Sequence, residues 1–251
     1  MKATILKVGG SLLWDPRKNV PNLKNMKAVI DFVNSHKEMK FVIVPGGGYI
    51  NNVCNEVAKQ LNPGVNDDDL DWIGIRSIMI IAETLAAGLG KHHQLLDHEP
   101  TDQEVVNFLR GDENVVICPA DKPGGSSNWH SVKCAIRFNT EGVINVGVRG
   151  LYTSDPDKNE KAQLIKKISW DELSAIIPDR KPRMNFPFDP EASALARKSG
   201  LWVKLLEGFQ DIENAIKGND FHGTLISGGR GRRILAIPRK RKSDDELIWK
   251  I

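Results

Sequence analysis

The chain has 251 residues, with 40% hydrophobic and 27% charged residues and a formal net charge of +3. These values are ordinary for a soluble globular protein with one large α/β domain or two fused lobes. No apolar run approaches the roughly 20 residues that a membrane span needs, so we expect no membrane-spanning segment. A strand pattern begins at once, which predicts no signal peptide. Cys54, Cys118 and Cys134 lack metal-ligand spacing, so we expect free thiols in a reducing cytoplasm.

The positive charge is unevenly distributed. Seven basic and no acidic residues lie between Arg230 and Lys242, which leaves the rest of the chain mildly acidic. Such a strip could bind nucleic acid or another polyanion, and it could equally be a solvated terminus. No aromatic residue alternates with the basic ones, unlike in proteins that bind single strands. We therefore expect a solvated terminus.

The first candidate site is the stretch Lys7-Val8-Gly9-Gly10-Ser11, which follows the apolar run Ala3 to Leu6. Paired glycines directly after a strand let main-chain N–H groups approach an anion without obstruction by side chains. Lys7 precedes these glycines and can place a point charge on the same anion. The segment predicts a phosphate-binding turn.

A second junction of the same kind follows. The pattern predicts a helix that begins after Asn22 as N-cap, and then a buried strand from Phe41 to Pro45. Gly46-Gly47-Gly48 comes next and leads into a helix from Tyr49 to Leu61. Two junctions predict two phosphate sites or one shared site, although each cluster alone is also typical of a tight turn. Neither matches the P-loop or the dinucleotide fingerprint.

The rest of the chain alternates between predicted helices and strands. Histidines 92, 93 and 98 fit no ligand pattern, so we expect them to be solvated and predict no metal site there. Gly147 to Pro156 is a glycine-bearing turn that could cradle a nucleotide base or be a plain surface loop. Ser169 and Glu172 predict a capping box. Predicted helices cover 70–89, 128–138, 189–198 and 212–216, and predicted strands cover 114–119, 142–146, 202–206 and 224–227. This alternation predicts a three-layer αβα sandwich with a largely parallel central sheet.

The order of these motifs resembles the amino acid kinase family. The chain has Lys7-Val8-Gly9-Gly10-Ser11, then Pro45-Gly46-Gly47-Gly48, and later Gly150-Leu151-Tyr152-Thr153-Ser154-Asp155-Pro156. Phe188-Asp189 before a helix and Gly223-Thr224-Leu225-Ile226 near the end are also similar to the family pattern. Within the family, the chain is most similar to the branch of uridylate kinase, aminomethylfuran-phosphate kinase and molybdenum storage protein.

The resemblance implies a single kinase-like domain with two lobes. An acceptor-binding lobe would cover about residues 1–120, and a lobe binding ATP with Mg²⁺ would cover about 121–251. Lys7 would neutralise the charge of the transferring phosphoryl group. The amides of Gly9 and Gly10 would hold the oxygens of this group, and Ser11 would also contribute to this phosphate site. Asp189 would lie near the lobe junction. The remaining implied contacts are Gly46, Gly47, Gly48, Asp71 and Gly74 for the phosphorylated acceptor, and Tyr152, Asp155 and Pro156 for the nucleotide.

The chain departs from the family at two places. Where family kinases carry Lys-x-Asp before the glycine of the nucleotide loop, this chain has Gly147 and Arg149. The helix that precedes it also lacks the family's Thr/Ser-Asp-Ser opening. Arg149 or Lys133 could supply the missing cation, and His130 or Asp121 could replace the acid. We include Arg149 with Lys7 and Asp189 as candidate catalytic residues.

Three functions remain open from the sequence. The first is an ATP-dependent phosphotransferase that acts on a small phosphorylated metabolite, similar to a nucleoside monophosphate kinase. The second is a nucleotide-binding storage or regulatory protein with little turnover. The third is nucleic-acid binding through the basic strip. We favour the kinase, acting in the cytoplasm as a homo-oligomer, with no membrane partner.

Overall fold

A computed structural model describes residues 2–90, 93–176 and 187–228. Its centre is an 8-stranded sheet in the order β10-β12-β11-β7-β1-β4-β6-β5. All neighbours in the sheet pair in parallel except β11 and β12, which are antiparallel. The strands are β1 (Ala3–Val8), β4 (Lys40–Pro45), β5 (His93–Leu95), β6 (Val115–Ile117), β7 (Gly142–Val146), β10 (Lys167–Ile168), β11 (Trp202–Leu206) and β12 (Gly223–Ile226).

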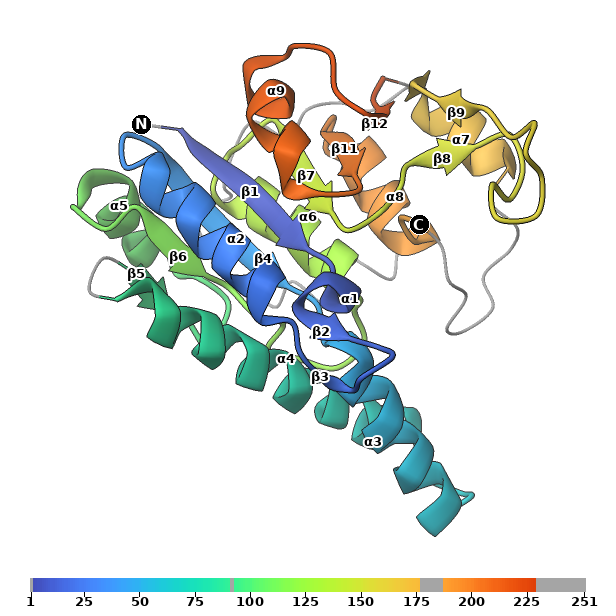
Figure 1. The fold of residues 1–251 in the computed structure, drawn as a ribbon. Helices are drawn as coiled ribbons and strands as arrows, with labels where there is room; N and C mark the ends of the chain where they lie inside the picture. The colour runs from blue at the N-terminus through green and yellow to red at the C-terminus, as the bar shows by residue number, and fades with distance from the viewer. Residues whose placement is uncertain (1, 91–92, 177–186, 229–251) are drawn as a thin grey trace.

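Helices cover both faces of this sheet, so the predicted three-layer α/β architecture is confirmed (Figure 1). One face packs against α2, α4 and α9, and the other packs against α5, α6, α7 and α8. The helices are α1 (Gly10–Leu13), α2 (Leu23–Ser35), α3 (Gly48–Leu61), α4 (Asp67–Leu89), α5 (Asp102–Arg110), α6 (Ser127–Arg137), α7 (Trp170–Ile176), α8 (Pro190–Lys198) and α9 (Ile212–Lys217).

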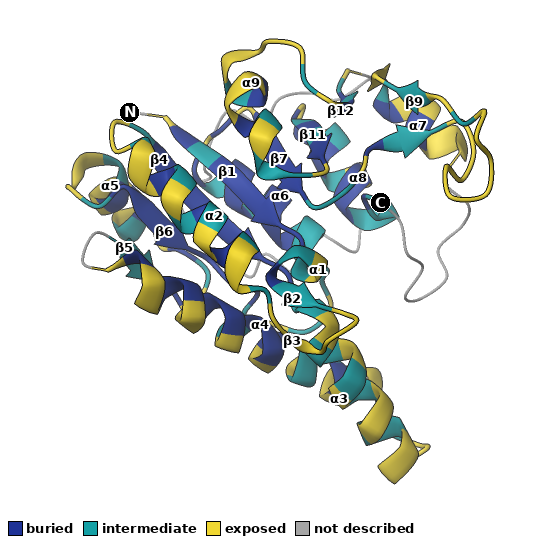
Figure 2. Ribbon diagram, viewed as in Figure 1, coloured by how far each residue is buried: buried dark blue, intermediate teal, exposed yellow. Residues whose placement is uncertain are grey.

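The central strands are the most deeply buried part of the protein, as Figure 2 shows. Every residue of β4, β6 and β7 is buried, which fits parallel strands covered on both faces. The alternating side chains of β1 contribute Ile5 to one core cluster and Leu6 to the other. The strand ends are therefore held rigidly between two cores.

Helix α3 differs from the other long helices. None of its residues is buried, and it extends away from the body of the molecule together with the start of α4 (Figures 1 and 2). Helix α4 is long and apolar enough to cross a membrane by length and composition, although Arg76 and Glu83 interrupt its apolar sequence. Buried helices of globular proteins meet the same criterion, and α4 packs its second half, from Ile81 to Leu89, into the core beside the sheet.

Several local predictions are confirmed. Asn22 caps α2 by accepting a hydrogen bond from the Asn25 N–H, and the side chains of Ser169 and Glu172 bond each other's main chain in a capping box. All three cysteines are free thiols. The basic strip from Arg230 to Lys242 lies outside the described residues, as does His92.

Other elements differ from the predictions. His93 begins the edge strand β5 rather than lying in a loop. The segments expected to be loops also contain two small hairpins, β2 (Trp14–Asp15) with β3 (Val20–Pro21) and β8 (Leu151–Tyr152) with β9 (Leu164–Ile165). Two-residue strands have too little periodicity to be recognised in a sequence. Helix α5 was not predicted, although Thr101 and Glu104 form a capping box at its start.

The two glycine junctions pack against each other, main chain on main chain. A Cβ atom added to Gly10 would lie 2.1 Å from the nitrogen of Gly48, and one added to Gly46 would lie 2.7 Å from the nitrogen of Gly10. Gly48 has a φ of +66°, which favours glycine. The strand–helix junctions after β1 and β4 can approach this closely only because neither carries side chains at the contact.

Substitution of Gly10 by Ala tests this contact. The added methyl group has no space against main-chain atoms, so we expect a loss of stability of about 1–3 kcal/mol. Urea unfolding of Gly10→Ala and wild type measures it. The control is Gly64→Ala, whose Cβ would meet only the Asn62 side chain at 3.5 Å. Equal stability of the two variants would contradict the packing described here.

Candidate active site

Three glycine turns meet at one edge of the sheet. Strands β7, β1 and β4 are parallel neighbours, and their carboxyl ends lead into Gly147, into Gly9 and Gly10, and into Gly46. A Cβ atom on Gly9 would lie 3.1 Å from the Val146 oxygen and 3.5 Å from the Gly147 Cα. The predicted convergence of the first two turns is therefore present in the structure, and a third turn joins them. In open α/β sheets this edge is where ligands usually bind.

Not every glycine amide at this edge is available to a ligand. The Gly9 N–H donates to the Val146 carbonyl at 2.7 Å, and the Gly46 N–H donates to the Val8 carbonyl at 2.9 Å. In this structure the Gly9 N–H is thus engaged with β7, and its role in holding phosphoryl oxygens stays a prediction. Gly10 and Gly48 are the first residues of α1 and α3, whose opening N–H groups have no acceptor within their own helices. These are the amides left to bind an anion, together with those of Ser11 and Gly47.

Lys7 lies one residue before the end of β1 and is only 7% exposed. Burial lowers its pKa from 10.5 to about 8, and the charge of Asp189 acts in the opposite direction. Burial disfavours the charged form of a lysine, while a nearby carboxylate favours it. The structure thus places an ammonium group with little solvent beside the glycine turns, where an anion would interact with it strongly.

Asp189 joins the starts of two helices. Its carboxylate caps α8 by accepting a hydrogen bond from the Ala192 N–H at 2.9 Å, and it accepts another from the Ser126 hydroxyl at 2.6 Å. Ser126 in turn caps α6 through the Trp129 N–H. The amino-terminal ends of α6 and α8 are therefore tied together near Lys7, and both carry partial positive charge. Ser126 was not among the predicted site residues.

The predicted acceptor residues lie around the start of α3. Gly74 in α4 packs against α3, since its added Cβ would lie 3.2 Å from the Oδ1 of Asn51. Gly47 contacts the same place, 3.6 Å from the Gly74 carbonyl oxygen by the same measure. Asp71 accepts a hydrogen bond from the Gly124 N–H at 2.8 Å and so ties α4 to the loop before α6. The buried Oδ1 of Asn51 has no partner among the described residues, which makes Asn51 a candidate that the sequence did not single out.

The predicted nucleotide residues lie on the β8–β9 hairpin and its turn. Gly150 has a φ of +97°, and the hairpin is anchored where the Leu151 N–H donates to the Thr224 hydroxyl at 2.8 Å. Tyr152 is half-buried, whereas Asp155 and Pro156 are exposed. Asp155 accepts a hydrogen bond from the Asp157 N–H at 3.0 Å, which shapes the turn. The hairpin thus presents these side chains near the sheet edge. Part of the hydrogen-bonding capacity of Asp155 is used to hold the conformation of the turn.

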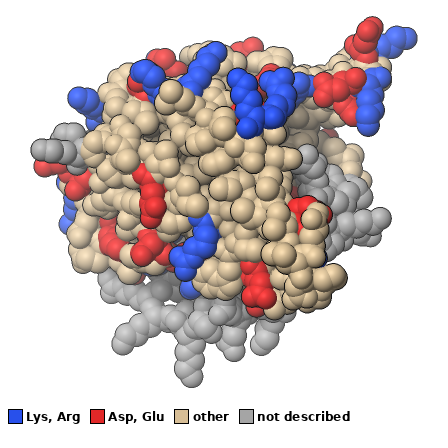
Figure 3. All heavy atoms as spheres, turned by 60° about the horizontal axis from the view of Figure 1, so that its bottom comes forward, with Lys and Arg blue, Asp and Glu red and all other residues tan. Residues whose placement is uncertain are grey.

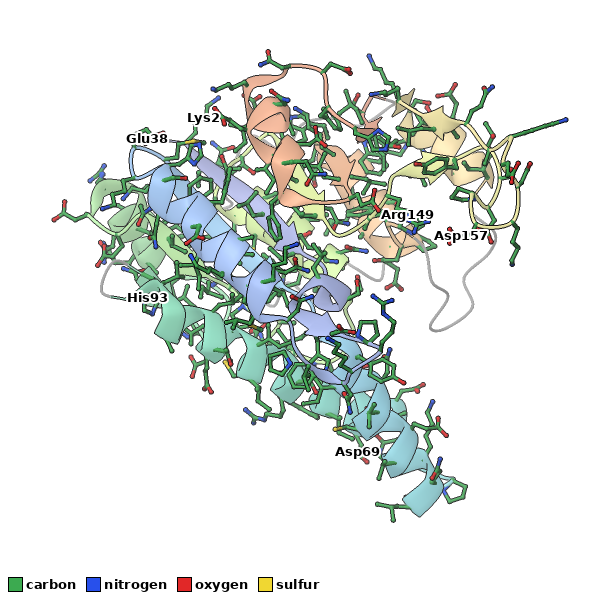
Figure 4. The ribbon with its side chains drawn as sticks, viewed as in Figure 1. Lys2, Glu38, Asp69, His93, Arg149 and Asp157 are labelled. Carbon is green, nitrogen blue, oxygen red and sulfur yellow. The ribbon has the colours of Figure 1, made fainter. Side chains whose placement is uncertain are left out.

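Each of the candidate replacement groups interacts with another residue in the structure, although the buried Nε2 of His130 has no hydrogen-bond partner among the described residues. Arg149 is about half exposed and pairs with Asp157 at 2.6 Å and with Glu207 at 3.4 Å; Figure 4 shows Arg149 beside Asp157. Lys133 pairs with Glu99 at 2.8 Å. His130 is buried and interacts with the Cys134 thiol, and Asp121 accepts from the Glu99 N–H. A catalytic role for Arg149 stays a prediction that would require these ion pairs to change.

The described residues do not themselves form a magnesium site. No group of three or more His, Cys, Asp or Glu side chains in the described ranges could hold a metal ion. Both carboxylate oxygens of Asp189 already accept hydrogen bonds. Mg²⁺ is commonly held by one or two carboxylates together with substrate phosphates, and the carboxylate that acts on Lys7 is that of Asp189.

Comparisons with known proteins agree with this architecture. A uridylate kinase of Thermofilum pendens is 25% identical over 228 residues, which cover 88% of this chain and 96% of that protein. A uridylate kinase of Sulfolobus acidocaldarius is 28% identical over 234 residues, covering 90% and 99%. The solved structure of uridylate kinase from Archaeoglobus fulgidus superposes with a TM-score of 0.73 at 23% identity, covering 90% of this chain and all of that one.

The family assignment rests on a match that extends over most of the chain and not on any single motif. The model of the amino acid kinase family matches residues 2–205, which include β1, the glycine turns, the β8–β9 hairpin and α8. The resemblance inferred from the motifs is therefore confirmed, and the chain belongs to the amino acid kinase family.

Proposed function

We propose that this protein is an ATP-dependent phosphotransferase that acts on a small phosphorylated metabolite, in the manner of a nucleoside monophosphate kinase. The observation that carries the proposal is the meeting of two bare glycine turns beside the buried Lys7. Supporting it, the relatives that cover almost the whole chain are named as uridylate kinases. Their sequence identity, below 30%, leaves the acceptor of this protein open.

In the proposed reaction the protein positions two phosphates and neutralises charge. Phosphoryl transfer requires little covalent help, so alignment and electrostatics supply most of the acceleration. The amides of Gly10 and Ser11 would hold the transferring group, and Lys7 would compensate its negative charge. Asp189 would keep Lys7 protonated and fix the helix ends around it. ATP would bring magnesium bound to its own phosphates, which neutralises part of the charge on transfer.

We assign the acceptor to the half of the chain up to about residue 120 and the nucleotide to the remainder. The acceptor phosphate would lie against Gly46, Gly47 and Gly48, with Asp71 and Gly74 beside its body. The nucleotide would lie against the β8–β9 hairpin with Tyr152, Asp155 and Pro156. This division follows the order of the glycine turns along the sheet edge, with Lys7 between the two groups.

A second candidate function is nucleotide storage or regulation with little turnover. Gly147 stands where family kinases carry a lysine, and Arg149 is held at the surface by two carboxylates. A kinase without a second cation would stabilise the transferring group less well. Tight ATP binding without acceptor-dependent ADP release would favour this second function.

We also propose that the protein works as a homo-oligomer in the cytoplasm. Large apolar side chains are exposed on α3 and α4, where a second copy could cover them: Tyr49, Val57, Leu61, Trp72 and Ile80. The face that Figure 3 presents includes a broad area without Lys, Arg, Asp or Glu, with basic side chains along its upper border and both acidic and basic ones to its left and below. Light scattering in solution determines the oligomeric state.

One set of measurements tests both the identity of the phosphate acceptor and the role of Lys7. Thermal-shift screening against ATP, nucleoside monophosphates and other phosphate monoesters identifies ligands, because a ligand of the folded state raises the melting temperature. ADP release is then measured with each hit. We expect Lys7→Met to fold and to lower turnover by about 10²–10³-fold, as loss of one transition-state contact does.

The matched control is Lys2→Met, which removes an exposed lysine that pairs with Glu141 just before the same strand. We expect this variant to keep wild-type turnover. Wild-type activity of Lys7→Met would refute the role of Lys7. Absence of ADP release with every acceptor, despite tight ATP binding, would replace the kinase by the storage function.

Stability should depend on pH through Lys7. The pKa of Lys7 is about 8 in the folded protein, whereas the ordinary lysine pKa of 10.5 applies to the unfolded chain. Between these values the unfolded chain binds a proton that the folded protein has released, so stability rises with pH. The wild type should gain up to about 3 kcal/mol relative to Lys7→Met between pH 8 and 10.5, and nothing below pH 8. Urea unfolding at several pH values gives the difference, and a constant difference would contradict the burial of a charged Lys7.

A further inference from the structure

Asn145 lies beside Lys7 in the sheet, but neither the motifs nor the proposed reaction uses it. It is on β7, at the position that pairs with Lys7 on β1. Residues in register on adjacent parallel strands direct their side chains to the same face of the sheet. Asn145 is 0% exposed, so its amide is enclosed with the Lys7 side chain under the starts of α6 and α8.

The hydrogen bonds of Asn145 fix which way its amide points. Its Nδ2 lies 3.4 Å from the Pro187 carbonyl oxygen and 3.2 Å from the Asn128 Oδ1. A carbonyl oxygen can only accept, so the nitrogen of the amide must face Pro187. The Oδ1 then points elsewhere, and among the described residues it has no hydrogen-bond partner although it is buried. A buried acceptor without a donor is unfavourable and indicates a missing partner.

Lys7 is the complementary group. Its ammonium carries three donors, and the residue is only 7% exposed. The neighbour on β4 is the apolar Val44. The charged group that acts on Lys7 is Asp189 of α8, whose two oxygens already accept from Ser126 and Ala192. At the start of α6, Ser126 and Asn128 are neutral, while His130 interacts with Cys134, which in turn interacts with Cys118.

We propose that Asn145 is the positioning residue of Lys7. The two side chains are not hydrogen-bonded in the structure as it stands; in the proposed arrangement the unpartnered Oδ1 accepts a hydrogen bond from the ammonium, while the Nδ2 bonds the segment before Asp189 and the first turn of α6. This proposal rests on the proposed function for its link to phosphotransfer. An amide suits the position because it orients the ammonium without neutralising it. A carboxylate there would hold the charge that the phosphoryl group needs, and an apolar side chain would leave the ammonium undirected.

The experiment measures the titration of Lys7 in the free protein. Lysine labelled with ¹³C and ¹⁵N reports the protonation of each ammonium by NMR, and Lys7→Met assigns the signal. Two variants change the hydrogen-bond acceptor at position 145 in opposite ways. Asn145→Asp adds a negative charge, and Asn145→Leu removes the hydrogen-bond acceptor. We expect the Lys7 pKa to rise by at least about one unit in the first and to fall below its wild-type value in the second.

Matched controls are Asn114→Asp and Asn114→Leu. Asn114 is also a buried asparagine, and its Nδ2 donates to the Val33 carbonyl at 3.2 Å next to the amino end of β6. These variants should lose stability without moving the Lys7 pKa. Shifts of the same sign in both Asn145 variants, or no shift, would overturn the proposal. Should these two variants not fold, Asn145→Ala also removes the acceptor and should lower the Lys7 pKa below its wild-type value, and an unchanged pKa in that variant would overturn the proposal.

A kinetic measurement separates this proposal from the proposed function. With an acceptor in hand, kcat/KM of the wild type should fall above about pH 8 as Lys7 loses its proton. This fall in kcat/KM should move to higher pH in Asn145→Asp, which should also have a lower kcat. It should move to lower pH in Asn145→Leu. If no acceptor supports turnover, the kinase proposal fails, but the NMR titration still decides the role of Asn145. Unchanged pH profiles in an active enzyme would refute Asn145 alone.

Discussion

The close contact between two glycine turns is the constraint on which the rest of the site depends. Gly10 and Gly46 lie so near each other that even one methyl group would collide with main-chain atoms. This proximity lets α1 and α3 begin side by side at the carboxyl ends of adjacent strands. It also places Gly47 against Gly74, so the direction of α4 is coupled to the same contact. A ligand at this edge would therefore meet a surface of main chain rather than of mobile side chains.

The number of glycines overstates the number of amides that can bind phosphate. Two N–H groups, those of Gly9 and Gly46, hold the turns to neighbouring strands. Their glycines serve close packing, and the helix-starting amides remain for an anion. In the proposed reaction Lys7 would then supply more of the charge compensation, because its ammonium is buried and its partner Asp189 already receives two hydrogen bonds. Burial makes the ammonium strongly attractive to an incoming anion, and this is the same effect that lowers its pKa.

Much of this organisation could be predicted from the sequence because it has local causes. Asn22 and Ser169 cap helices where capping residues were expected, and Asp189 caps the helix that was predicted to start there. Apolar runs before glycines indicated the buried strands. Asn145 could not be found this way, because its importance comes from the register of β7 with β1. The Ser126–Asp189 bond joins residues 63 positions apart, which no local pattern indicates. Helix α5 was missed despite a readable capping box.

The glycine at position 147 shows why a missing family lysine is more than the loss of one charge. Gly147 has a φ of +104°, and a Cβ atom there would lie 3.0 Å from Leu12. A lysine at this place would be strained in its main chain and crowded by α1. The turn after β7 has thus a conformation that excludes the side chain, and restoring lysine alone would not rebuild the family pattern. Charge compensation at this edge must come from Lys7, from the ligand's own magnesium, or from a rearranged Arg149, and these sources differ in their dependence on pH and on metal. Lysine titrates near the working range whereas arginine does not, so the pH profile of turnover distinguishes Lys7 from Arg149 as the dominant cation.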